Sequence, residues 1–274
     1  MAKPILEAVL RRDRVIVAGA LILLIVLAWG YVLWLMDVMR MGGMEMPGMR
    51  MVANPFGAAM IPALQPWSVI EFALMFVMWT IMMFGMMVPS AAPMILIYAR
   101  VGREAEKKGK PLAGTAYFVA GYLLAWTAFS LVATTGQWML ERASLLTPMM
   151  ASKSAIVGGI VLVAAGVFQW MPLKDICLNH CQAPLMFIQR HGGFRRQPLG
   201  SLRIGFHHGL YCIGCCWALM ALLFVGGIMN VVWIAGIAIF VLAEKVIPLG
   251  NILSRVAGIA FIAAGVWLLG SSTF

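Results

Sequence analysis

Long apolar runs separated by short polar connections dominate the chain. The first run, Val15 to Leu35, holds 21 residues without a charge and follows three arginines. A bilayer core takes about 20 apolar residues per helical span, so this run predicts a membrane helix. It is too long for a signal-peptide core, and no small-residue cleavage site follows it, so we expect it to be retained. Six further runs predict spans at Val69 to Val88, Leu112 to Leu140, Ala155 to Met171, Gly209 to Met229, Val231 to Ile247 and Val256 to Leu269.

The basic residues between these runs predict the orientation. With the N-terminus inside, the inside segments carry 16 Lys and Arg residues and the outside segments carry four. Positive residues are retained on the cytoplasmic side of a membrane. The pattern therefore predicts an all-α, polytopic transmembrane helical bundle of about seven spans, with a cytoplasmic N-terminus and the C-terminus outside.

Composition agrees with a membrane protein and excludes a soluble one. Hydrophobic residues make up 63% of the chain and charged residues 11%, and the mean hydropathy is +0.95. Soluble domains carry about 25% charged residues. The net charge is +10, and the basic residues that produce it lie between the apolar runs. They therefore indicate the topology of the chain and not nucleic-acid binding. We expect one integral membrane domain over residues 1–274, with a methionine-rich outside loop at 36–66 and an inside connection at 172–205.

The cysteines and histidines gather in one window of the chain. All five Cys and all four His lie within residues 177–216, at the predicted cytoplasmic face, where thiols stay reduced. Cys177 and Cys181 are four residues apart, which places both sulfurs on one side of a helix. One face of the fifth predicted span carries a histidine and three cysteines. They are spaced as i, i+4, i+7 and i+8: His208, Cys212, Cys215 and Cys216. Two facing thiol pairs with a histidine beside them are therefore expected.

Thiolate and imidazole ligands favour Cu(I), zinc or iron–sulfur chemistry. The spacing follows no zinc-finger or ferredoxin pattern, so zinc and iron–sulfur stay open beside copper. The competing interpretation is packing, because a buried cysteine often acts as a small hydrophobic residue.

Methionine is the second unusual feature, with 23 residues in the chain. The thioether is a soft ligand suited to Cu(I). The Gly-rich outside loop contains Met41, Met44, Met46 and Met49, and a stripe on the second predicted helix contains Met78, Met82 and Met86. A neighbouring stripe contains Met83, Met87 and Met94. Together with the inside thiols, these residues predict a path for a soft metal. The alternatives are adaptable core filler for the stripe and a lipid-interface segment for the loop.

Two further features concern the ends of spans. Glu244 and Lys245 lie at the inner end of the sixth predicted span, where we expect a structural anchor at the membrane interface. Pro89 and Pro93 remove amide donors from the second span, which predicts a kink or a broken helix.

Several segments together resemble a known family. They are Trp79 to Pro93, Pro172 to Cys181, the Gly-Cys-Cys-Trp sequence within His208 to Met220, and Ala243-Glu244-Lys245. In these segments the chain resembles the bacterial proteins grouped as predicted metal-binding integral membrane proteins. The resemblance implies metal binding and a location in the bacterial inner membrane, but no particular reaction.

These observations favour a metal-handling protein over an enzyme. The leading hypothesis is Cu(I) binding in copper transport or in delivery to a partner, either a metallochaperone or a membrane cuproenzyme. The chain has no nucleotide-binding Gly-rich loop, which disfavours ATP-driven pumping by this chain alone. The alternatives are a membrane thiol–disulfide redox protein that uses the cytoplasmic-face cysteines, and an assembly subunit with a structural metal site.

Overall fold

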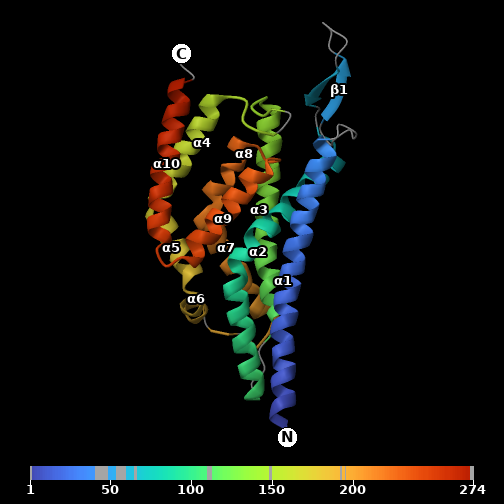
Figure 1. The fold of residues 1–274 in the computed structure, drawn as a ribbon, viewed down its shortest axis with the longest axis vertical. Coiled ribbons are helices and arrows are strands. Elements are labelled where there is room, and N and C mark those ends of the chain that lie inside the picture. The colour runs from blue at the N-terminus through green and yellow to red at the C-terminus, as the bar shows by residue number, and fades with distance from the viewer. Residues whose placement is uncertain are drawn as a thin grey trace.

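The computed structural model describes residues 2–40, 49–53, 60–64, 67–109, 113–147, 150–191, 193–194 and 196–271. Within these ranges the chain forms a helical bundle and one small β-hairpin (Figure 1). The helices are α1 (Ala2–Arg40), α2 (Val69–Lys107), α3 (Thr115–Arg142), α4 (Ala155–Phe168), α5 (Pro172–Gln182), α6 (Pro184–Arg190), α7 (Pro198–Ala221), α8 (Leu223–Gly226), α9 (Val231–Val246) and α10 (Gly250–Ser271). The antiparallel hairpin pairs β1 (Met49–Ala53) with β2 (Met60–Leu64).

The helical fold class is confirmed, and the hairpin is a small addition that sequence analysis missed. Among the described residues, five helical segments are long and apolar enough to span a membrane: Ile16–Asp37, Val69–Lys107, Thr115–Arg142, Pro198–Gly226 and Gly250–Ser271. Helices α4 and α5 form a sixth candidate that is bent by 65°. The predicted span in α9 has only 16 residues. Seven crossings and the cytoplasmic N-terminus therefore stay predictions.

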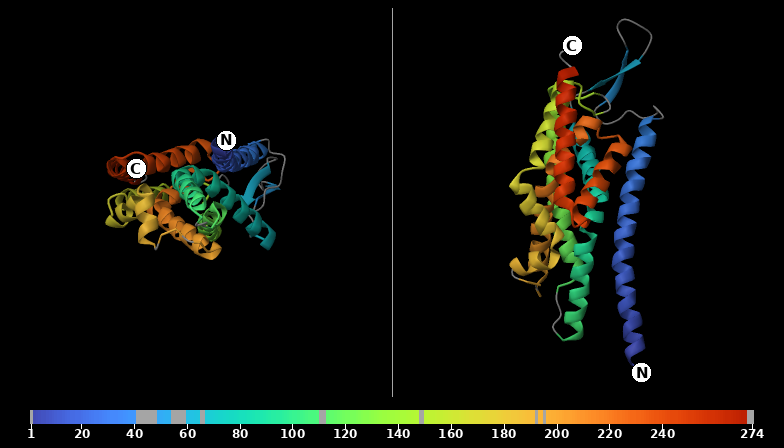
Figure 2. Two further views of the ribbon diagram at one scale, coloured as in Figure 1. Left: turned by 90° about the horizontal axis from the view of Figure 1, so that it is seen from below. Right: turned by 60° about the vertical axis from the view of Figure 1, so that its left-hand side comes forward.

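The helices form an elongated bundle with the termini at opposite ends (Figure 1). The end-on view in Figure 2 shows α4 and α10 at one side of the bundle, and α1 with the hairpin at the other. The predicted inside connection contains the short helices α5 and α6. Helix α5 packs against α7 and α9, and Leu178 of α5 and Phe187 of α6 are fully buried, so this connection contributes to the core of the bundle.

Helix α2 continues through Pro89 and Pro93, so of the two predicted outcomes the broken helix is wrong and the kink stays a prediction. Because Pro89 has no N–H group, the carbonyl of Gly85 loses its helical donor. The indole Nε1 of Trp29 donates to this carbonyl at 3.2 Å. Neighbouring helices commonly satisfy such freed groups in membrane proteins. The proline thus produces a specific contact between α1 and α2.

Glycines allow α4 and α10 to pack with their backbones in contact. A Cβ atom placed on Gly166 would lie 2.7 Å from the Gly258 carbonyl oxygen, and one placed on Gly265 would lie 2.8 Å from the Gly159 oxygen. The two glycines of each helix are seven residues apart, so they lie on one face. Helices gain no hydrophobic driving force for association in lipid. Small residues at the interface instead allow close van der Waals packing of the two backbones.

We expect Gly265→Ala to destabilise the bundle by about 1–3 kcal/mol, because the new methyl group has no space against α4. Thermal unfolding of the detergent-solubilised protein measures the effect. The matched control is Gly236→Ala in α9, where a Cβ atom has no neighbour within 4 Å. Equal unfolding temperatures for the two variants would contradict this packing.

Candidate metal site

The site is built on α7, which lies directly against α3. Cβ atoms placed on Gly121 of α3 and on Gly205 of α7 would meet backbone oxygens of the opposite helix, those of Leu202 and Phe118. One placed on Gly209 would lie 2.5 Å from the Ala125 side chain. This close contact brings Tyr122 of α3 beside the cysteine-bearing turns of α7.

Cys212 lies at the centre of the polar contacts and is 1% exposed. Its sulfur lies 2.8 Å from the Lys245 ammonium and 3.1 Å from the Tyr122 hydroxyl. Lys245 also donates to the Ser90 hydroxyl at 3.1 Å, and Tyr122 donates to the Met87 carbonyl at 3.0 Å. Four helices, α2, α3, α7 and α9, therefore converge on this one thiol.

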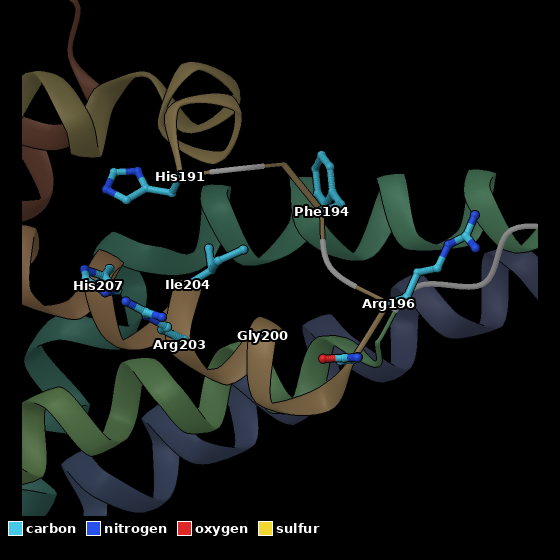
Figure 3. Close-up of a pocket in the computed structure, with 8 residues that line it drawn as sticks. His191, Phe194, Arg196, Gly200, Arg203, Ile204 and His207 are labelled. Carbon is cyan, nitrogen blue, oxygen red and sulfur yellow. The ribbon is translucent and has the colours of Figure 1, made fainter.

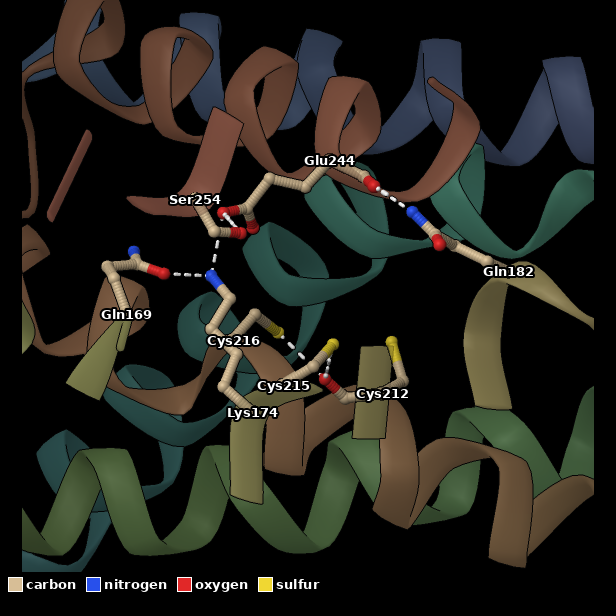
Figure 4. Close-up of polar contacts among 8 residues, drawn as sticks. All are labelled: Gln169, Lys174, Gln182, Cys212, Cys215, Cys216, Glu244 and Ser254. Atoms are coloured by element: carbon tan, nitrogen blue, oxygen red, sulfur yellow. Dashed lines mark hydrogen bonds and ion pairs between the residues drawn. The ribbon is translucent and has the colours of Figure 1, made fainter. Parts of the chain in front are cut away.

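Cys215 and Cys216 lie one turn further along α7 (Figure 4). Both thiols donate to the carbonyl of Cys212, at 3.0 Å and 2.9 Å. The sulfur of Cys216 also lies 4.0 Å from the thioether sulfur of Met87. Thiol and thioether donors from two helices are thus in contact in the buried core.

Helix α5 supplies the remaining cysteines, and they differ in position. The side chain of Cys181 interacts with those of Cys212 and Cys215. Cys177 packs against α7 at Gly214, where an added Cβ atom would lie 2.8 Å from its sulfur. The structure therefore brings together four of the five cysteines and places Cys177 at the edge.

His208 lies one turn before Cys212 on α7 and is 3% exposed. Its ring packs near Tyr122 and Phe187, with centroid distances of 5.7 Å and 5.3 Å. Among the described residues, no hydrogen-bond partner reaches its Nδ1 atom. A buried polar nitrogen without a partner is costly, and metal ligation would satisfy it.

A buried ion pair lies beside the thiols and holds the end of α9 in the bundle. Glu244 is 2% exposed and accepts from Lys174 of α5 at 2.6 Å and from Ser254 of α10 at 2.6 Å. Lys174 also donates to Gln169 (Figure 4). Glu244 and Lys245 were expected to form an anchor at the membrane interface. Both are buried within the bundle, where they join α9 to α2, α5, α7 and α10, and their depth relative to the membrane interface stays a prediction.

The predicted methionine ligands have different outcomes. Met41, Met44 and Met46 lie outside the described residues, and Met49 begins β1 with a side chain that is not described. Met78, Met82 and Met86 are buried on the core face of α2. The thioether in contact with a cysteine belongs to Met87, in the neighbouring stripe. Sequence spacing identified the stripes, but only the contact of Met87 with Cys216 distinguishes between them.

The described residues contain no group of three or more His, Cys, Asp or Glu side chains arranged to hold a metal ion. Cu(I) does not require such a group, because two thiolates in an approximately linear arrangement suffice for this soft d¹⁰ ion. The donors around Cys212 are thiols, a thioether and an imidazole, which is the set that soft thiolate-binding metals prefer. The chemistry of the side chains therefore fits Cu(I) better than it fits a hard cation.

Comparison with known proteins adds a family. Residues 76–268 match the PpoB2 family, described as copper chaperones. The match covers more than half of the 274 residues and includes the whole cysteine cluster, so the chain belongs to this family. No curated protein and no solved structure matches the chain. The family confirms that the metal-binding resemblance is related to copper.

We expect Lys174→Met to destabilise the protein by about 3–5 kcal/mol, because it leaves the buried Glu244 carboxylate without its cation. Thermal or denaturant unfolding in detergent measures the loss. Arg255→Gln is the matched control, since it breaks the Arg255–Asp175 pair at 3.5 Å, where the arginine is 53% exposed. Such exposed pairs contribute at most about 1 kcal/mol. Similar losses in the two variants would contradict the structural role of the Lys174–Glu244 pair.

Proposed function

We propose that this member of the PpoB2 copper chaperone family holds Cu(I) on buried thiols inside the membrane bundle and passes the ion to a protein acceptor. The observation that carries the proposal is the convergence of Cys181, Cys212, Cys215 and Cys216 from two helices. The convergence lies in the part of the chain that matches the copper chaperones. Copper is here the cargo of the protein and not a resident cofactor.

The charge around Cys212 supports binding of a monovalent soft ion. Two thiols that ligate Cu(I) release their protons, and the resulting bis-thiolate complex carries one negative charge. An isolated charge in an apolar bundle is costly. The Lys245 ammonium, 2.8 Å from the Cys212 sulfur, supplies the compensating positive charge. The complex and its counter-charge are then neutral together.

The number of sulfur donors supports release as well as binding. Cu(I) needs two thiolates, and the site offers four neighbouring thiols, one of which, Cys216, also contacts the Met87 thioether. Spare donors allow the ion to change partners by ligand exchange without leaving sulfur coordination. A protein acceptor that presents its own thiolate or thioether would remove the ion by the same exchange.

The proposal extends to the acceptor and to the route. We propose delivery to a cuproenzyme assembly partner, and not nucleotide-driven pumping by this chain. Entry of copper through the outside loop of Met41, Met44, Met46 and Met49, and passage along Met78, Met82 and Met86, stay predictions. What supports the inner part of that route is that Met78, Met82 and Met86 are buried on α2, and that Met87, the residue after Met86, contacts the thiol of Cys216.

Cys212→Ser should lose Cu(I) to a competing chelator at a concentration that leaves the wild-type protein loaded. The measurement is anaerobic reconstitution with Cu(I), followed by metal analysis and titration with a colorimetric Cu(I) chelator. Met87→Leu should weaken Cu(I) binding. Its control is Met75→Leu, which removes another buried thioether of the same helix and should leave Cu(I) binding unchanged. The Cys177→Ser variant should bind Cu(I) more tightly than the Cys212→Ser variant does, because Cys177 lies at the edge of the cluster.

The same preparation separates copper handling from its alternatives. Unchanged copper binding in Cys212→Ser would contradict the proposed site. A protein that takes up no copper but forms a mixed disulfide at Cys212 or Cys215 with a thiol oxidoreductase would favour the redox alternative. Copper that raises the unfolding temperature but never transfers to a thiol-bearing acceptor would favour a structural metal site.

Lys245→Met should lower Cu(I) affinity by about 10–100-fold, the range seen when groups that support metal ligands are removed. Lys245→Arg keeps the positive charge and should retain most of the affinity. Lys108→Met, at the exposed end of α2, is the control for a change in net charge alone. Chelator competition measures all three variants, and thermal unfolding identifies any loss of folding. Binding by Lys245→Met as tight as by the wild type would contradict the counter-charge argument.

A further inference from the structure

A second site lies away from the cysteines, in a cavity of about 720 Å³ at the connection between α6 and α7. Its basic side chains are His191, at the end of α6, Arg196, and Arg203 and His207 of α7. Figure 3 shows His191 across the cavity from Arg203 and His207, with Arg196 further along. None of the described residues that line the cavity is acidic. The cavity therefore favours an anion.

The beginning of α7 adds to this field. The helix starts at Pro198 and has 24 residues, and Gly200 of its first turn lines the cavity. The side chain of the N-cap residue, Gln197, makes no capping hydrogen bond. The N-terminus of a helix carries a partial positive charge and unpaired N–H groups, which suit phosphate oxygens. Arginine matches the geometry of phosphate with paired donors.

The two helices that border the basic cavity, α6 and α7, carry exposed apolar side chains. Leu199, next to Gly200, is 75% exposed, and Leu185 and Met186 of α6 are each about half exposed. Helix α6 lies toward the end of the bundle that carries the N-terminus, the predicted cytoplasmic side (Figure 1). A basic pocket bordered by apolar surface, at the end of a membrane helix, resembles the sites at which lipid headgroups bind on the cytoplasmic side of membranes.

We infer that this cavity binds a phosphate group, presented by an anionic phospholipid whose acyl chains lie along Leu199 and α6. The arginines hold the phosphate oxygens, and the first turn of α7 provides backbone N–H groups. A bound headgroup would hold the α6–α7 connection against the start of the helix that carries the cysteines. The inference does not depend on copper, because none of the cavity residues belongs to the thiol cluster.

The test measures thermal unfolding and native mass spectra of the full-length protein in detergent. The additions are phosphatidylglycerol, phosphatidylcholine or inorganic phosphate. Phosphatidylglycerol should raise the unfolding temperature and remain bound in the mass spectrum, whereas phosphatidylcholine should do neither. Arg196→Gln/Arg203→Gln should abolish both effects. Arg100→Gln, an exposed arginine of α2 that does not line the cavity, should retain them.

Inorganic phosphate distinguishes the two sources of the group. A shift with phosphatidylglycerol alone supports the lipid, and an equal shift with phosphate that the double variant abolishes assigns the site to a soluble phosphate. No response to either addition, or an unchanged lipid response in the double variant, would overturn the inference. Both arginines are exposed, and an unfolding temperature of the lipid-free double variant equal to that of the lipid-free wild type checks that it is folded. Failure of the copper proposal would leave this result unaffected.

Discussion

A lysine ammonium inside an apolar helical bundle needs polar or anionic partners, and much of the structure is arranged around that need. Lys245 finds a hydroxyl in α2 and a thiol in α7. The residue before it, Glu244, is neutralised by Lys174 of α5. Two adjacent residues of α9 therefore hold charges of opposite sign toward different helices. Buried ionisable residues of this kind are expensive in a membrane and commonly mark a functional site.

Close backbone packing makes these contacts possible. Glycines at the α3–α7 and α4–α10 interfaces allow helices to approach until an added methyl group would meet the opposite backbone. The first interface places the Tyr122 hydroxyl at the Cys212 sulfur. The second holds α10, whose Ser254 completes the contacts of Glu244. The polar cluster and the small-residue interfaces thus depend on one another, because short hydrogen bonds between helices require short distances between their axes.

The sequence was sufficient to predict the helical class, five of the seven apolar spans and the gathering of cysteines on one helix. Hydropathy and helical spacing carry that information locally, as the single buried face of His208, Cys212, Cys215 and Cys216 shows. The partners of those residues depend on contacts between distant segments. Tyr122 lies 90 residues from Cys212, and Met87 lies 129 residues from Cys216. Glu244 and Lys245 were assigned to the interface because a charged pair near the end of an apolar run usually lies there. The pairing of Glu244 with Lys174 of α5 was not visible in the local pattern.

The hydrogen bonds of the cysteines imply an order in which the sulfurs become ligands. Cys215 and Cys216 each donate a thiol proton to the same backbone carbonyl, that of Cys212, whereas the sulfur of Cys212 faces an ammonium and a hydroxyl. Ligation by Cys215 or Cys216 removes a proton and so sacrifices a backbone hydrogen bond, which contributes about 1 kcal/mol. Cys212 donates to no backbone carbonyl, and the Lys245 ammonium beside its sulfur stabilises the thiolate. A metal ion would therefore be held more tightly at Cys212 than at Cys215 or Cys216, by about 1 kcal/mol or about fivefold, so exchange with an acceptor would begin at the latter two sulfurs.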